Sequence, residues 1–115
     1  MASHVIYARK STESEDRQIL SIDSQIRELK TLALHRGIAV SEVLTEAHSA
    51  KAPGRAVFGQ LIRRVNRGEI RGIVCWKMDR LARNHMDTGL ILQALADGKL
   101  QEVITSDRTY TRDGN

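Results

Sequence analysis

Residues 70–84, IRGIVCWKMDRLARN, join an apolar run to a strongly charged one. The first half is almost continuously apolar, which is typical of a central strand that is covered on both faces. The second half places Asp79, Arg80 and Arg83 directly after that strand. In open parallel sheets, functional sites gather where strands end and helices begin. The stretch therefore predicts an α/β protein with a polar site at the carboxyl edge of its sheet.

The rest of the chain repeats this alternation of short β-type runs and helical periodicity. The expected strands lie at residues 4–7, 40–44, 70–76 and 101–105. The expected helices, each of which ends at a glycine, lie at residues 21–37, 57–68 and 86–98. This order predicts a mostly parallel sheet of about four strands with helices on its faces. The polar tail after Thr105 is expected to form no further element.

Length and composition narrow the class of protein. A chain of 115 residues allows one domain with a single modest core. The net charge is +4, and thirteen of the eighteen basic residues are arginine, which favours recognition of phosphate and a nucleic-acid partner. The single cysteine, Cys75, excludes an internal disulfide and a multi-thiolate zinc site, and its apolar surroundings predict a buried thiol. Without a signal peptide or a membrane-length apolar run, we expect a cytoplasmic protein.

The stretch YARKS, residues 7–11, places a serine without an obvious base at the exit of the first expected strand. Strand geometry puts Tyr7, Arg9 and Ser11 on one face. The Gly-x-Ser-x-Gly turn of hydrolases is absent, and all four histidines are expected at the surface. These histidines are His4, His35, His48 and His85. Ser11 is therefore either a nucleophile with other partners or an ordinary strand-end hydroxyl.

Arginines are the partners that the sequence offers to Ser11. Arg9 lies two residues before it, and further arginines follow the neighbouring strands. These are Arg55, Arg80 and Arg83. Arginines at the start of a helix oppose its dipole, so a bound anion would offset their unfavourable placement. Such a pocket suits a phosphodiester, because arginine neutralises the charge that develops on the phosphorus oxygens.

Two other polar residues stand close to this arginine group in the predicted fold. Asp79 is expected to cap a short helical turn, with Arg80 and Arg83 three apart on one face. It is also the carboxylate best placed to orient the arginines or accept a proton. A solvated turn with an Asp–Arg surface pair is the alternative. Gln25 lies on the apolar stripe of the first expected helix, where it either satisfies a backbone group or reaches a polar site.

Two other functions stay open on these residues alone. The arginines could form a non-catalytic module that binds phosphate or nucleic acid. A metal-dependent nuclease is the second alternative, since Glu46 and Asp79 could meet at adjacent strand ends. It is the less favoured one, because the remaining acidic residues are scattered along the chain.

Two spaced motifs, in order along the chain, resemble one known family: Tyr7-x-Arg9-x-Ser11 and Asp79-Arg80-Leu81-x-Arg83. The family is that of the serine recombinases, which includes resolvases and invertases, and the stretches SIDSQIREL and GRAVFGQLI extend the resemblance over the chain. The loop TESEDRQIL after Ser11 is similar to that of the large serine integrases. The resemblance implies a resolvase-like three-layer α/β fold and site-specific DNA recombination, with no metal and no cofactor.

The resemblance also implies a role for each site residue. Ser11 attacks a DNA phosphodiester, becomes joined to the 5′ phosphate and frees a 3′ hydroxyl. The arginines that hold the scissile phosphate are Arg9, Arg55, Arg80 and Arg83. Asp79 supports this cluster, and Gln25 is a polar group of the active site. Three residues match positions near the pocket, with substrate binding as their expected role: Tyr7, Ser49 and Glu46.

The partners implied by the resemblance are double-stranded DNA and further copies of the chain. Members of the family act as dimers that pair into tetramers. Residues 1–115 match the catalytic domain alone, and the long dimerisation helix and the DNA-binding domains have no counterpart in them. We therefore expect this domain by itself to be a monomer or an altered dimer, with weak DNA affinity and little recombination activity. The resemblance implies a prokaryotic or phage-encoded protein.

Overall fold

A mostly parallel sheet forms the centre of the domain. A computed structural model describes residues 3–9, 21–46, 56–82 and 84–112, and for Asp79 and Arg80 it describes the backbone only. The strands are β1 (Ser3–Arg9), β2 (Val40–Glu46), β3 (Ile70–Val74), β4 (Glu102–Ile104) and β5 (Thr109–Tyr110). They lie in the order β2-β1-β3-β4-β5, with β5 antiparallel to β4 and the other pairs parallel. The predicted α/β fold with a mostly parallel sheet is confirmed.

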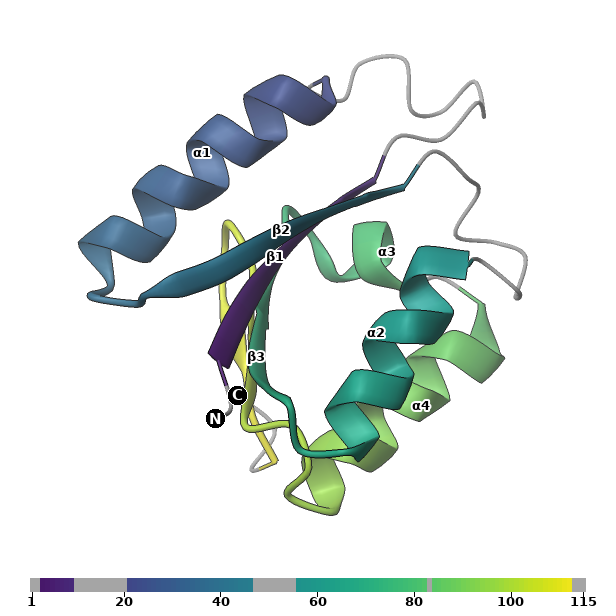
Figure 1. Cartoon of the computed structure of the whole chain (residues 1–115). Helices are drawn as coiled ribbons and strands as arrows, with labels where there is room; N and C mark the ends of the chain where they lie inside the picture. The colour runs from purple at the N-terminus through teal and green to yellow at the C-terminus, as the bar shows by residue number, and fades with distance from the viewer. Residues whose placement is uncertain (1–2, 10–20, 47–55, 83, 113–115) are drawn as a thin grey trace.

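Helices cover both faces of this sheet, as predicted. The helices are α1 (Ile22–His35), α2 (Ala56–Asn66), α3 (Met78–Leu81) and α4 (His85–Ala96). Figure 1 shows α1 on one face, α2 and α4 on the other, and the short α3 near the end of β3. Of the helices that the structure describes, none is long and apolar enough to cross a membrane.

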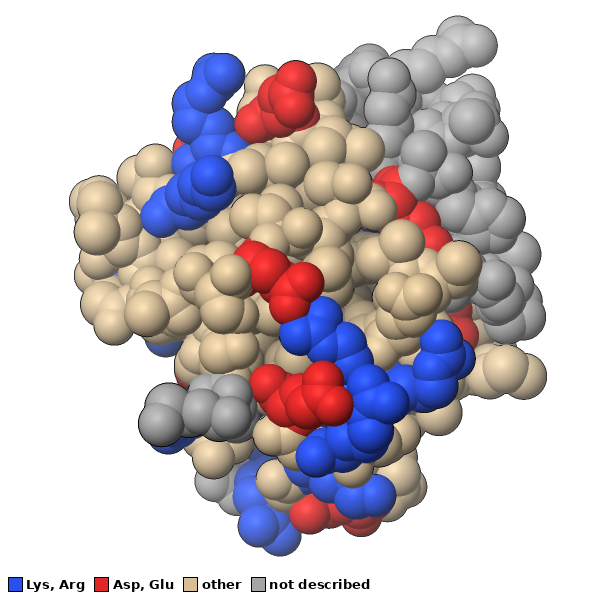
Figure 2. All heavy atoms as spheres, viewed as in Figure 1, with Lys and Arg blue, Asp and Glu red and all other residues tan. Residues whose placement is uncertain are grey.

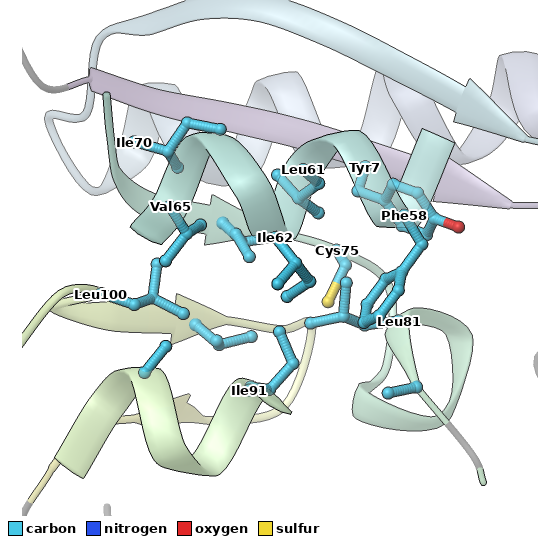
Figure 3. Packing of buried hydrophobic residues seen from close by; sticks show 14 of the residues in the cluster. Tyr7, Phe58, Leu61, Ile62, Val65, Ile70, Cys75, Leu81, Ile91 and Leu100 are labelled. Atoms are coloured by element: carbon cyan, nitrogen blue, oxygen red, sulfur yellow. The ribbon is translucent and has the colours of Figure 1, made fainter. Parts of the chain in front are cut away.

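The larger hydrophobic core fills the space between the sheet and the pair α2 and α4 (Figure 3). Phe58 packs edge-on against Tyr7, with ring centroids 6.4 Å apart. Cys75 is fully buried in the same core, as its apolar surroundings predict. A smaller cluster under α1 contains Ile6, Leu29, Val74 and Ile104. β1 contributes to both clusters, because successive strand residues point to opposite faces of the sheet.

The expectation that no element follows residue 105 is wrong. β5 pairs with β4 through the register Val103↔Tyr110 and Ile104↔Thr109. The turn between them is held by Thr105, whose hydroxyl bonds to the carboxylate of Asp107 at 2.7 Å. A strand of two residues carries too little periodicity to be recognised in a sequence, and only its pairing defines it.

His4 is largely buried, in contrast to the predicted surface position. It lies inside β1, where its side chain is 13% exposed, and its Nε2 atom is 2.7 Å from Oε2 of Glu102. Gly72 lies between them, since it is the register partner of both His4 on β1 and Glu102 on β4. A Cβ atom at Gly72 would lie 2.4 Å from the imidazole ring. The glycine therefore lets the histidine cross β3 and tie β1 to β4.

Substituting Gly72→Ala should lower the free energy of unfolding by about 1–3 kcal/mol, because the new methyl group displaces the His4 ring from Glu102. In a His4→Ala background the same substitution should cost almost nothing, since the obstructing ring is gone. Urea unfolding of the four variants measures this coupling.

The matched control is Gly89→Ala in the interior of α4, where a Cβ atom has no neighbour within 4 Å. It should raise stability by about 0.5–1 kcal/mol, because alanine loses less backbone entropy than glycine in a helix. An equal cost of Gly72→Ala with and without His4 would show that the ring is not the obstruction.

Candidate active site

The strand order creates a topological switch point at the carboxyl ends of β1 and β3. From β1 the chain passes through α1 to β2 on one side, and it returns through α2 on the opposite face of the sheet to reach β3 (Figure 1). A crevice suited to a ligand forms outside the strand ends where such connections diverge. Arg9 is the last residue of β1, and Ser11 follows it by two residues. The predicted site therefore lies at the position that the topology favours.

Arg9 is fully buried at this edge, with 0% of its surface exposed. Strand alternation places its side chain on the same face as Tyr7, toward α2 and α3. Arginine does not lose its proton in proteins, so the guanidinium brings a permanent positive charge to the end of β1. Burying such a charge is costly unless acceptors surround it, which marks this position as one selected for more than packing.

Gln25 is buried on α1, as the sequence predicts. Its Nε2 atom donates to the backbone carbonyl of Arg9 at 3.2 Å. This contact is the first of the two roles left open by the sequence, the satisfaction of a backbone group. Because the carbonyl is the last of β1, the hydrogen bond ties α1 to the peptide that leads toward Ser11. The direct role in an active site that the resemblance implies for Gln25 stays a prediction.

Glu46 and Tyr7 form a buried hydrogen-bonded pair beside Arg9. Glu46 ends β2 and is the register partner of Arg9. Its Oε1 atom accepts from the Tyr7 hydroxyl at 2.5 Å and from the Phe58 amide at 3.1 Å, and its Oε2 atom accepts from the Val57 amide at 2.9 Å. Both carboxylate oxygens thus accept hydrogen bonds from this chain, and two of the three donors are amides in the first turn of α2.

The charged segment after β3 differs from the prediction in two respects. α3 begins at Met78 with Lys77 in the capping position, so Asp79 lies inside the helix and does not cap it. The helix ends at Leu81, and Ala82 is extended, so the helical face expected to carry both Arg80 and Arg83 stops before Arg83. A four-residue helix is too short to hold two arginines on successive turns.

The approach to α3 is held by the turn between β4 and β5. The Ser106 amide and hydroxyl both donate to the carbonyl of Trp76, at 3.1 and 2.8 Å. Nζ of Lys77 lies 3.5 Å from Oδ2 of Asp107 in the same turn. The predicted site did not include this turn, although Ser106 and Asp107 directly after an apolar run are typical turn residues.

Several expected site residues lie outside the described part of the chain. They are Ser11, Ser49, Arg55 and Arg83, together with the side chains of Asp79 and Arg80. The structure therefore brings together, from the predicted set, Tyr7, Arg9, Gln25, Glu46 and the backbone of α3. All of these except Gln25 and α3 come from the adjacent ends of β1 and β2.

The arginines in and directly after the last turn of α2 do not form an unbroken basic surface. Arg64 contacts Glu42 at 2.5 Å and Glu69 at 3.3 Å, and Arg67 contacts Glu69 at 2.8 Å. The hydrogen bond to Glu42 raises the pKa of the Arg64 guanidinium. Figure 2 shows basic and acidic side chains interleaved over the C-terminal half of α2. This face therefore gives little support to a general arginine-rich binding module.

The described residues include no group of three or more His, Cys, Asp or Glu side chains that could hold a metal ion. The expected meeting of Glu46 with Asp79 cannot be followed, since the Asp79 side chain is not described. Glu46 itself directs both oxygens to Tyr7 and to α2. It is therefore engaged in contacts other than metal ligation.

Solved structures of similar fold include catalytic domains of serine recombinases. The N-terminal catalytic domain of TP901-1 integrase matches with a TM-score of 0.73 and 29% identity, over 89% of this chain and 75% of that one. The C-terminal catalytic domain of ISC1926 TnpA, an IS607-like serine recombinase, matches with a TM-score of 0.71 and 23% identity, over 91% and 70%. The first ORF in transposon ISC1904 from Sulfolobus solfataricus P2 matches in fold, with a TM-score of 0.72 and 19% identity, over 93% and 69%. A search of curated proteins finds no significant match.

These likenesses and the switch-point site define the class of the domain, a resolvase-like three-layer α/β fold. The model of the resolvase N-terminal domain matches residues 4–115. The chain belongs to the resolvase family, and the identification as a serine recombinase catalytic domain that its motifs suggest is confirmed.

The turn that holds the approach to α3 should make stability depend on pH. The hydrogen bond from the Thr105 hydroxyl, aided by the charge of Lys77, holds the pKa of the Asp107 carboxyl below its usual value in the folded state. A lowered folded-state pKa stabilises the fold above the unfolded pKa of about 3.9, and this stabilisation disappears as the pH falls through the folded-state pKa. Asp107→Asn should therefore be less stable than the wild type at pH 7, and the two unfolding curves should converge at acidic pH.

Urea unfolding at a series of pH values between neutral and acidic measures this difference. Ser106→Ala is the control, because it removes the hydroxyl contact to Trp76 without changing a titrating group. It should lower stability by the same amount at every pH. If the Asp107→Asn difference does not change with pH, the carboxylate does not contribute through its charge.

Proposed function

We propose that this domain cuts and rejoins DNA strands in site-specific recombination, with Ser11 as the nucleophile. The observation that carries the proposal is the match of residues 4–115 to the resolvase N-terminal domain. The position of the site supports it, because Ser11 follows the strand that lies at the topological switch point. Arg9, fully buried at the end of that strand, supplies a fixed positive charge two residues before Ser11 in the sequence.

The proposed reaction exchanges one phosphodiester bond for another. The Ser11 hydroxyl loses its proton, and its oxygen forms a bond to the DNA phosphorus. The bond between phosphorus and the 3′ oxygen breaks, and that oxygen takes up a proton and leaves as a 3′ hydroxyl. The protein is then joined to the 5′ phosphate. Because the phosphoester bond is conserved, attack by a 3′ hydroxyl on the same phosphorus reverses the step without an external energy source.

The arginines have the role of stabilising charge on the phosphorus oxygens during this transfer. Arg9 is the member of the proposed arginine set whose side chain is described. Because this side chain is completely buried, it must become accessible when DNA binds if it is to contact the phosphate. Arg55, Arg80 and Arg83 complete the set in our proposal. Asp79 orients them or accepts a proton, and Ser49 lies near the pocket.

The partners in this proposal are double-stranded DNA and further copies of the chain. The matched structures include the catalytic domain of TP901-1 integrase and that of ISC1926 TnpA, an IS607-like serine recombinase. We propose that residues 1–115 act in the same way, as the catalytic part of a longer recombinase that works as a dimer and a tetramer. By itself this domain is expected to bind DNA weakly and to recombine it poorly.

The test is covalent trapping with the full-length recombinase that carries this domain and a duplex containing its own recombination site. The wild type should yield a protein–DNA adduct through Ser11, and Ser11→Ala should yield none while DNA binding is largely kept. Denaturing electrophoresis detects the adduct, and a mobility shift measures binding.

Ser41→Ala is the matched control, since this exposed serine lies near the opposite end of β2 from Glu46. It should form the adduct as the wild type does. An adduct that persists in Ser11→Ala would exclude Ser11 as the nucleophile. Cleavage that stops when a chelator is added would favour a metal-dependent nuclease instead.

A further inference from the structure

The carboxylate of Glu46 is shared between a phenol and the start of a helix. Its side chain lies in the interior, with the residue 8% exposed, and Tyr7 is 0% exposed. Three donors bind it: the Tyr7 hydroxyl at 2.5 Å, the Val57 amide at 2.9 Å and the Phe58 amide at 3.1 Å. The pair thus links the ends of β1 and β2 to the first turn of α2.

α2 needs such a carboxylate because its own first turn supplies no acidic residue. The first amides of a helix have no partner within the helix, and the positive end of its dipole lies there. The helix begins at Ala56, so Val57 and Phe58 carry two of these amides. Glu46 binds both from the neighbouring strand, in place of the side chain that normally caps a helix from within the sequence.

This arrangement leaves Glu46 unsuited to contact with substrate. A carboxylate facing a phosphodiester would repel it, whereas this one directs both oxygens at donors of its own chain. Its carboxylate instead lies at the end of β2, on the strand next to Arg9, which is its register partner on β1. The Val57 and Phe58 amides of α2 are occupied by this carboxylate, so these two donors are not available to a bound anion.

We propose that Glu46 and Tyr7 are positioning residues, which hold the first turn of α2 and through it the peptide that joins Arg55 to Ala56. This differs from the substrate-binding role expected for both residues from the sequence. The proposal rests on the proposed function, because Arg55 belongs to the phosphate-binding set only there. Tyr7 supports the carboxylate, and Phe58 packs on the Tyr7 ring, so the hydrogen bonds and the core fix the same turn.

The first test measures amide hydrogen exchange by NMR in the 115-residue chain. Glu46→Gln keeps the shape but replaces one acceptor with a donor, so exchange at Val57 and Phe58 should become about 10- to 100-fold faster. Glu46→Asp keeps the charge on a shorter side chain and should restore part of this protection. Tyr7→Phe leaves the hydrogen bonds from the Val57 and Phe58 amides to Glu46 in place, so it should accelerate exchange less than Glu46→Gln does. Exchange at Ile73 in β3 reports global unfolding, and only the excess at α2 counts.

The second test titrates inorganic phosphate and follows the side-chain Nε–H signals of the arginines. In the wild type the Arg55 signal should shift, and Glu46→Gln should weaken the apparent affinity at Arg55 about tenfold or more. Glu42→Gln is the matched control, because this glutamate lies on the same strand and contacts Arg64 in the C-terminal half of the same helix. It should change neither the Val57 exchange nor the phosphate response.

The outcomes separate the two proposals. If exchange at Val57 and Phe58 is unchanged in Glu46→Gln, Glu46 does not hold the first turn of α2, and the proposal is overturned whatever the result of the phosphate titration. If exchange becomes faster but the phosphate-dependent shift of the Arg55 signal is unchanged, the contacts of Glu46 with α2 serve the fold alone, and the positioning role is overturned. A wild type in which phosphate shifts no arginine signal argues against the phosphate pocket of the proposed function and removes the basis for positioning Arg55.

Discussion

Parallel pairing of β1 with a strand on each side is the constraint around which this domain is built. β1 lies between β2 and β3, and it supplies residues to the hydrophobic clusters on both faces of the sheet. The connection through α1 and the connection through α2 lie on opposite faces of the sheet, so they diverge at the carboxyl end of β1. Diverging connections of this kind favour a ligand crevice outside the strand ends.

Opposite charges are buried side by side at this edge, and they serve different purposes. Glu46 neutralises the amino end of α2 and accepts from Tyr7, while Arg9 on the adjacent strand brings a permanent positive charge to the end of β1. The position of Glu46 is explained by the helix it holds, and we propose that Arg9 is placed there for the anionic substrate of the proposed function.

The sequence predicted most of the architecture, because the segments with helical periodicity are long and the apolar runs of the strands are clear. It failed where an element is defined by contacts alone. β5 has two residues, the predicted short turn α3 begins at Met78 and not after a cap at Asp79, and His4 reaches Glu102 only because Gly72 stands opposite both. Gln25 was recognised as an unusual polar residue, and Glu46 was placed near the pocket by the family resemblance, but their hydrogen-bond partners on Arg9 and α2 belong to other elements of the fold.

Two things follow from residue order without any knowledge of the fold: the alternation of strands and helices, and the motifs that mark the family. Both depend on local spacing, since hydrophobic period and motif geometry are properties of neighbouring residues. The order of strands in the sheet, the switch point at β1 and the partners of Glu46 and His4 arose only in three dimensions. They depend on pairing between segments far apart in the chain, which local spacing does not encode.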